Sequence, residues 1–228
     1  MGTLKLGLMD TIFKNYGDTI GILGISSGTF MSTSNILRKP GFGTSSAARF
    51  HERRANSIQV ESAEFSGFQA GLQYSFADAK TDTRNQTTTS MGVKWDNGPF
   101  YVALAYEIHD GYFSGSSPTA TGSMRNTNDQ AVNSKDTATQ FTIEYRLAKD
   151  HRFEFDWIQK NYDENATVAG RFQNYNNNAY LLAMENRWSD QWRTAANFVR
   201  SDAGSCARVA AVCSTDGLDG SKFTLGAA

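Results

Sequence analysis

The chain has 228 residues, and its 22 Lys and Arg are balanced by 23 Asp and Glu. A net charge near zero argues against a nucleic-acid-binding protein, which uses a basic surface. The mean hydropathy is −0.47 and no run of about 18 apolar residues occurs, so a transmembrane helix is excluded. A transmembrane β-barrel is compatible with this composition, because only every second residue of its strands faces lipid.

Alternation of apolar and polar residues predicts nine strands and the start of a tenth. In the first, over residues 2–9, Leu4, Leu6 and Leu8 share one face and Lys5 lies on the other. The clearest strand covers residues 100–109. The remaining strands are predicted over residues 53–61, 67–76, 88–95, 137–147, 151–161, 178–188 and 191–201, and from 222 onward.

The predicted connections alternate between short and long. The short ones cover residues 62–66, 96–99, 148–150 and 189–190, and the long ones cover 10–52, 77–87, 110–136, 162–177 and 202–221. An antiparallel meander then places all long loops at one end, as in outer-membrane barrels. The apolar face carries aromatic pairs beside the short turns, which predict an interfacial girdle: Trp95 with Phe100, Tyr145 with Phe153, and Trp188 with Trp192.

Residues 10–52 form the longest connection and show no sustained period of a strand or a helix. Structureless connections of this length are uncommon in compact domains unless they are functional. The charges in the middle of the flanking strands, on the polar face, predict a water-filled lumen. We therefore expect residues 10–52 to fold back into this lumen and narrow it.

Four stretches resemble general (trimeric) porins of Gram-negative bacteria, most of all those of beta-proteobacteria. They are GTLKLGL, RANSIQVESAEFSGFQAGLQYS, WDNGPFYVALAYE and the closing SKFTLGAA. The resemblance implies an all-β fold, an antiparallel up-and-down transmembrane β-barrel of sixteen strands, of which about ten are present here. Residues 1–228 would form a single, partial barrel domain with residues 10–52 as its constriction loop. A partial barrel leaves bare strand edges in lipid, so we expect the chain to be a fragment.

The same resemblance implies a homotrimer in the lipid of the bacterial outer membrane, with no cofactor, that lets ions and small hydrophilic solutes diffuse passively. Such a channel selects by pore size and by the field of its charged side chains. Residues 10–54 carry six bases and three acids, a charge of +3, which predicts a weak preference for anions.

Strand parity and the position of the loop nominate pore-lining residues. Arg53 is the first choice, because it shares the predicted lumen face with Ser57 and lies beside the end of the loop. Arg54 is then expected to point outward, or to lie above the membrane where the strand begins. The other nominated pore-lining or constriction residues are Lys5, Lys94, Arg38, Asp18, Glu107, Arg187 and Arg193.

Two alternatives belong to other classes of protein. An outer-membrane barrel enzyme, a phospholipase or protease, would use a pair such as His109 with Glu107, but a solvated His at the end of a strand is the commoner case, and no GxSxG or HExxH motif occurs. A soluble β-sandwich that binds a ligand would carry the same alternation of residues with its apolar faces buried.

The two cysteines, Cys206 and Cys213, lie in one polar loop. Two nearby cysteines in a protein of an oxidising compartment favour a short disulfide over two free thiols. A metal site is not predicted, because no His accompanies the pair and two thiolates do not complete a zinc site.

Overall fold

The computed structural model describes residues 1–17, 37, 50–76, 85–111, 133–148 and 150–227. These ranges contain a short helix, α1 (Ile12–Tyr16), and the strands of an antiparallel sheet. The strands are β1 (Thr3–Asp10), β2 (Arg53–Glu61), β3 (Phe68–Phe76), β4 (Thr87–Asn97), β5 (Phe100–Asp110), β6 (Ser134–Leu147), β7 (His151–Glu164), β8 (Phe172–Arg187), β9 (Arg193–Ser201), β10 (Ser205–Arg208) and β11 (Gly220–Ala227).

The strands follow one another in the sheet as they do in the sequence. Each strand from β1 to β9 pairs with its neighbour in the chain, β11 pairs with β9, and β10 pairs with β8. The predicted all-β, up-and-down antiparallel fold is therefore confirmed, whereas the total of sixteen strands stays a prediction. No helix within the described ranges is long and apolar enough to span a bilayer.

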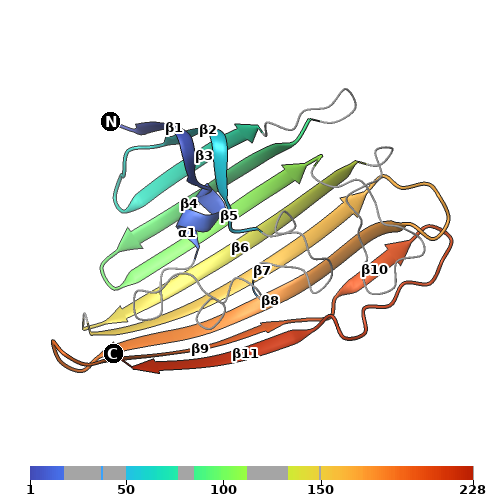
Figure 1. Ribbon diagram of the computed structural model, residues 1–228. Helices are drawn as coiled ribbons and strands as arrows, with labels where there is room; N and C mark the ends of the chain where they lie inside the picture. The colour runs from blue at the N-terminus through green and yellow to red at the C-terminus, as the bar shows by residue number, and fades with distance from the viewer. Residues whose placement is uncertain (18–36, 38–49, 77–84, 112–132, 149, 228) are drawn as a thin grey trace.

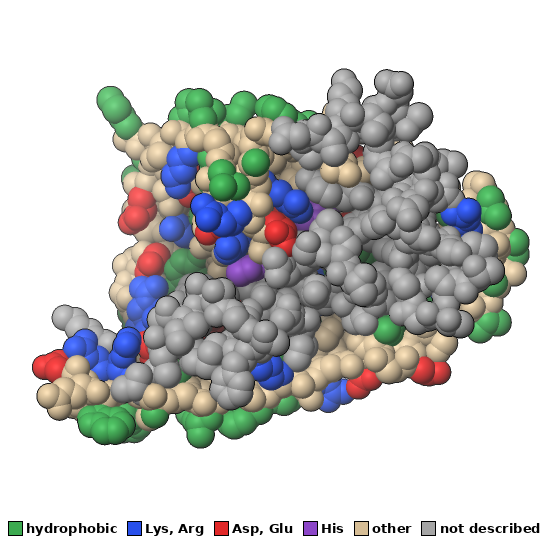
Figure 2. All heavy atoms as spheres, viewed as in Figure 1, with side chains coloured by type: hydrophobic (Ala, Val, Ile, Leu, Met, Phe, Trp, Pro, Cys, Tyr) green, Lys and Arg blue, Asp and Glu red, His purple; other side chains and the backbone are tan. Residues whose placement is uncertain are grey.

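The sheet curves into an open trough with α1 on its concave side, which we call the inner face (Figure 1). Large apolar side chains on the convex, outer face are exposed, as Leu6 (69%) and Phe223 (67%) illustrate. Polar side chains such as Gln73, Ser90 and Thr142 are buried on the inner face. Figure 2 shows the same division, with hydrophobic side chains along the outer rim and charged ones within. The predicted strand faces are confirmed, and the distribution is the reverse of a soluble sandwich, whose apolar faces are buried.

Aromatic side chains gather where the short turns join the strands, as predicted. The rings of Phe100 and Tyr145 lie 5.0 Å apart, and Trp188 and Trp192 are both exposed. The turn between β4 and β5 is tight because Gly98 adopts a φ of +59°, which glycine accepts without a steric cost. The aromatic girdle therefore lies at the end of the sheet that carries the short connections.

Strands β6, β7 and β8 are longer than predicted, with 14, 14 and 16 residues. At about 3.3 Å per residue they extend for about 45–55 Å, beyond the apolar band of about 25 Å in outer-membrane barrels. The loop boundaries predicted over 110–136 and 162–177 were therefore wrong. These extensions are mostly polar, and their buried aromatic residues Tyr162, Phe172 and Tyr175 do not recur at every second position. They therefore lack the alternation on which the prediction depended.

The predicted loop over residues 202–221 contains the additional strand β10. It pairs with the polar extension of β8, and Cys206 lies opposite Tyr175 in this ladder. A disulfide joins Cys206 to Cys213, with the two Cα atoms 5.8 Å apart. The disulfide thus closes a short loop directly after β10, at the end of the sheet remote from the short turns.

Candidate functional site

Helix α1 packs on a patch of the inner face that is free of bulky side chains. Gly71 of β3 and Gly92 of β4 are cross-strand partners, and Ala105 of β5 lies opposite Gly92. A Cβ atom added at Gly71 would lie 2.9 Å from the hydroxyl oxygen of Tyr16, and one at Gly92 would lie 3.2 Å from Cγ2 of Ile12. The two glycines therefore let the helix approach the wall more closely than any larger residue would allow.

Polar contacts hold α1 in this position. The backbone N–H of Phe13 donates to Oγ of Ser90 at 2.8 Å, and the hydroxyl of Tyr101 donates to the carbonyl oxygen of Tyr16 at 2.7 Å. The ammonium group of Lys94 lies 5.2 Å from the centre of the Tyr16 ring, a favourable cation–π position. Burial raises the pKa of Tyr16 to about 12, with a smaller contribution from the charge of Glu61, so its phenol stays neutral.

The end of segment 10–52 has its own contacts with the inner face. The ring of Phe50 stacks on His109 with centroids 4.5 Å apart and lies 5.8 Å from the ring of Tyr162. Lys160 donates from Nζ to the carbonyl oxygen of Leu37 at 3.0 Å. Leu37 and Phe50 are completely buried. The described parts of the segment therefore lie against β3, β4, β5 and β7.

A buried polar cluster links both ends of this segment to β5. We call it the Glu107 cluster, and its members are Glu107, His109, Arg54, Ser90 and Thr11. Oε1 of Glu107 lies 2.8 Å from Nε2 of His109, and Nη2 of Arg54 lies 3.4 Å from the same nitrogen. The side chains of Ser90 and Thr11 also lie beside the carboxylate of Glu107. Glu107 and His109 are completely buried, so the expected solvated position of His109 was wrong.

Thr11 has two further roles at the start of the segment. Its backbone N–H donates to the carbonyl oxygen of Glu52 at 3.2 Å, which joins the beginning of the segment to its end. Its side-chain oxygen accepts from the N–H of Lys14 at 3.2 Å and so caps α1. One residue therefore connects the closure of the segment, its helix and the Glu107 cluster.

The arrangement of the cluster gives no support to the enzyme hypothesis. In a hydrolytic triad the His lies between the nucleophilic Ser and the carboxylate. Here the carboxylate of Glu107 lies between Ser90 and His109, and all three side chains are buried. This order and burial suit a structural anchor.

A β-bulge in β2 changes which side chains face inward. Gly7 pairs with Ser57, but Met9 pairs with Arg54, so two residues of β2 oppose one residue of β1. Asn56 lies within this bulge and has a φ of +49°. A bulge of this kind reverses the alternation of the residues beyond it.

The bulge explains why the expected direction of Arg54 was wrong. Arg54 reaches His109 on the inner face, although strict alternation predicts that it points outward. The side chain of Arg53 is 60% exposed, and its Nε lies 3.5 Å from Oδ1 of Asp10. The role of Arg53 as a pore-lining residue stays a prediction.

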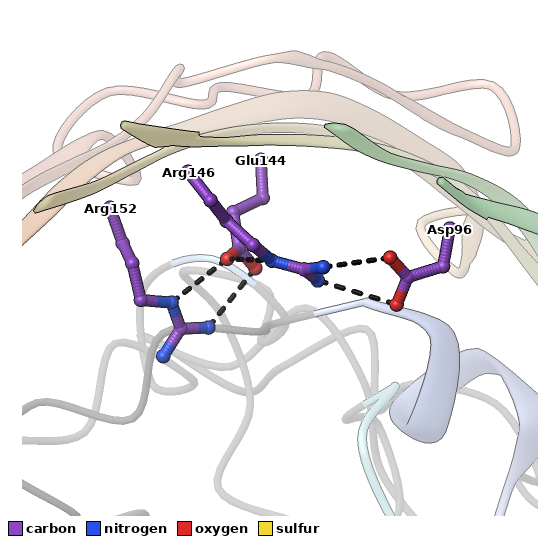
Figure 3. A network of polar contacts seen from close by, with 4 residues as sticks. All are labelled: Asp96, Glu144, Arg146 and Arg152. Atoms are coloured by element: carbon purple, nitrogen blue, oxygen red, sulfur yellow. Dashed lines mark hydrogen bonds and ion pairs between the residues drawn. The ribbon is translucent and has the colours of Figure 1, made fainter. Parts of the chain in front are cut away.

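A second network lies on the inner face near the short turns (Figure 3). Glu144, completely buried, accepts from Nε of Arg146 at 2.8 Å and from Nε and Nη2 of Arg152 at 2.8 and 3.0 Å. Arg146 also donates to both carboxylate oxygens of Asp96, at 2.7 and 3.4 Å. Arg146 and Arg152 are direct cross-strand partners, an arrangement in which like charges repel. The carboxylate between them offsets this repulsion.

A family model for Gram-negative porins matches residues 1–228 of the chain. The chain belongs to the Gram-negative porin family. The porin is located in the outer membrane, in agreement with its solved structural neighbours. No curated protein sequence matches the chain.

Solved outer-membrane proteins share the fold of this porin. A loop L8 deletion mutant of OmpT from Vibrio cholerae aligns with a TM-score of 0.65 at 15% identity, over 99% of this chain and 64% of that one. OmpT expressed in the outer membrane of V. cholerae gives 0.62 at 15%, over 99% and 61%. An anion-selective porin from Comamonas acidovorans gives 0.62 at 16%, over 88% and 54%. The chain thus spans less than two thirds of the length of each of these proteins.

The residues predicted to line the pore lie in different parts of the structure. Lys5, in the edge strand β1, forms an ion pair with Glu61 of β2 at 2.7 Å. Lys94 lies over the ring of Tyr16, and Glu107 is the centre of the buried cluster. Lys94 and Glu107 lie on or near the surface that receives α1.

The remaining nominated residues lie elsewhere. Arg187 and Arg193 are cross-strand partners at the short-turn end, and Nη2 of Arg187 lies 2.8 Å from Oδ1 of Asp190. Asp18 and Arg38 lie outside the described residues. The structure therefore places the described nominees in three groups: Lys94 and Glu107 near α1, Arg187 and Arg193 at the short-turn end, and Lys5 and Arg53 on β1 and β2 at the edge of the sheet.

Several residues that position α1 and the Glu107 cluster were not identified from the sequence. Gly71 and Gly92 occupy inner-face positions in the middle of strands, where glycine usually weakens a sheet. Two such glycines in adjacent strands were a detectable signal of close approach by another segment. Tyr16, Ser90 and Arg54 carried no comparable signal, since their partners come from distant parts of the chain.

Adjacent arginines provide a test of the bulge in this porin. We expect Arg53→Gln to change the free energy of unfolding by less than about 1 kcal/mol, because an exposed ion pair contributes little. We expect Arg54→Gln to cost about 1.5–3 kcal/mol, because it removes a hydrogen bond of a charged group in a buried cluster. Urea unfolding of the two variants in lipid vesicles measures the difference, and a larger loss for Arg53→Gln would contradict the assignment.

Proposed function

We propose that this porin forms a water-filled channel for the passive diffusion of ions and small hydrophilic solutes, with residues 10–52 as its constriction. The observation that carries the proposal is the position of α1, Leu37 and Phe50, all buried on the polar inner face of a sheet whose outer face is apolar. A segment held inside the trough reduces the cross-section open to solutes. The family supports an oligomer, and a homotrimer is part of the proposal.

This channel would select solutes by their size and their charge, without a chemical reaction. The inner face carries charges of both signs, and the paired ones are held in fixed geometry by contacts such as those of Glu144 and Glu107. Charges in a confined aqueous path act on a passing ion more strongly than the same charges in bulk water, because the low-dielectric protein wall focuses their field. That the protein catalyses no reaction is also part of this proposal.

Recording of the whole protein in planar lipid bilayers, together with the swelling of vesicles in sugars of increasing size, tests the proposal. The expected result is stepwise ion conductance and a sharp upper limit on the size of permeant sugars. Protein that inserts into the bilayer but conducts no ions would refute the channel.

The charge of the constriction segment predicts a weak preference for anions. Residues 10–54 carry a charge of +3, and a protein with a similar fold is described as an anion-selective porin. In a tenfold KCl gradient we expect a reversal potential of the sign set by chloride, well below the limit of about 59 mV for perfect selectivity. A potential of the sign set by potassium would overturn this prediction.

A further inference from the structure

A polar pocket of about 340 Å³ lies on the inner face at the short-turn end of β7, β8 and β9. Its lining consists of three arginines and three carboxylates: Asp150, Arg152, Glu185, Arg187, Asp190 and Arg193. Figure 2 shows blue and red side chains together at the end of the sheet where the turn between β8 and β9 lies. The pocket therefore offers both signs of charge to one small ligand.

Some of these charges already have partners. Arg152 donates two hydrogen bonds to Glu144, and Arg187 donates to Asp190 at 2.8 Å. Arg193 and Glu185 have neither a hydrogen bond nor an ion pair with the side chains of the described residues. Glu185 still attracts the guanidinium group of its cross-strand neighbour Arg152 over a longer distance. Both Arg193 and Glu185 can nevertheless form a direct hydrogen bond with a ligand.

The pairing of the strands adds a second observation. Arg193 lies directly opposite Arg187, and Glu185 lies directly opposite Arg152. Two arginines in direct opposition repel each other. Asp190 already pairs with Arg187, so a further carboxylate bound to Arg193 would offset the charge that remains. Arginine binds carboxylates through paired, charge-assisted hydrogen bonds.

We propose that this pocket binds small zwitterionic solutes with an ammonium and a carboxylate group, as in an α-amino acid. The carboxylate of the solute accepts hydrogen bonds from Arg193, and its ammonium group donates to Glu185. The inference rests on the proposed channel only in that the channel delivers the solute. Weak binding of this kind suits a transit site, since a permeant solute must also leave.

The charges of the lining disfavour other ligands. A simple anion would meet Glu185 and Asp150 as well as the arginines. A metal ion needs several oxygen or nitrogen ligands together, and the described residues contain no group of three His, Cys, Asp or Glu side chains arranged for one. A ligand that carries both charges matches Arg193 and Glu185 together.

Binding of glycine to the whole, detergent-solubilised protein, measured by ligand-observed NMR, tests the inference. Acetate lacks the ammonium group and methylammonium lacks the carboxylate, so they serve as matched probes. We expect both probes to bind about tenfold more weakly than glycine, and Arg193→Gln and Glu185→Gln each to weaken glycine binding about tenfold, because each loses one hydrogen bond of a charged group.

The chain offers matched controls for both variants. Arg200→Gln removes an arginine of the same strand whose side chain is 62% exposed and lies 3.7 Å from Asp202, outside the pocket. Glu64→Gln removes an exposed glutamate between β2 and β3. Both controls should bind glycine as the unmodified protein does.

Two results would overturn the inference. One is equal affinity for acetate and glycine, which would make the pocket a simple anion site. The other is an equal loss of glycine binding in Arg200→Gln. NMR binding in detergent does not require ion conduction, so failure of the pocket and failure of the channel are distinguishable.

Discussion

Replacement of Glu107 by Ala is expected to detach both ends of segment 10–52 from the wall of the porin. Glu107 is completely buried and is contacted by His109, Ser90 and Thr11. Its removal leaves buried polar groups without their partner, which costs about 3–5 kcal/mol when a buried pair is broken. The sheet itself keeps its ladder of backbone hydrogen bonds, so the loss should fall mainly on the docked segment.

Two measurements distinguish release of the segment from general damage to the barrel. Limited proteolysis within residues 10–52 should become faster, and single-channel conductance should become larger and noisier. Glu107→Gln keeps an oxygen acceptor for His109 and should cause a smaller change. Glu185→Ala, which removes an inner-face glutamate of the turn-end pocket, should leave cleavage unchanged. Normal cleavage and conductance in Glu107→Ala would show that the cluster supports the wall alone.

The sequence was most informative where one face of a strand is apolar and the other polar. Strand β5 was predicted over residues 100–109 and extends from Phe100 to Asp110. The Asn-rich extension of β8 was missed, because its two aromatic residues, Phe172 and Tyr175, lie three positions apart and so do not alternate with polar residues. This extension forms a strand because its backbone pairs with the backbones of β7 and β10.

The candidate site was less accessible to sequence reasoning, because it depends on contacts between distant residues. His109 was expected to be solvated, yet Phe50, which covers its ring, lies 59 positions away in a segment without periodicity. The bulge at Asn56 also reversed the direction of Arg54, and no residue type in that stretch requires a bulge. Such local exceptions to alternation become visible only when the register of both strands is known.

Replacement of Gly71 by Val is expected to push α1 off the inner face and widen the channel. The three atoms nearest to an added Cβ at Gly71 all belong to side chains of the helix, namely Cδ1 of Ile12 at 2.5 Å, the hydroxyl oxygen of Tyr16 at 2.9 Å and Cγ1 of Ile12 at 3.2 Å. Val favours a strand, so β3 itself tolerates the change. Overpacking costs about 1–3 kcal/mol, which shifts the docking equilibrium of the helix roughly 5- to 150-fold.

The ionisation of Tyr16 reports directly on this displacement. Burial raises its pKa from 10.0 to about 12, so the stability that docking contributes is complete below pH 10 and is lost as the pH rises through about 12. In Gly71→Val the pKa should fall toward 10, which a phenolate absorbance titration measures against the same variant carrying Tyr16→Phe. Conductance should rise in parallel.

A rescue and a control complete this test. Ile12→Ala removes atoms that the new side chain would meet, so it should restore part of the docking in Gly71→Val. Gly220→Val introduces the same residue in β11, where an added Cβ has no neighbour within 4 Å, and should change neither conductance nor the titration of Tyr16. An unchanged pKa of Tyr16 in Gly71→Val would mean that α1 does not depend on the glycine surface. The contacts of Phe13 and Tyr101 would then be sufficient to hold the helix, because they are the polar contacts that the substitution leaves in place.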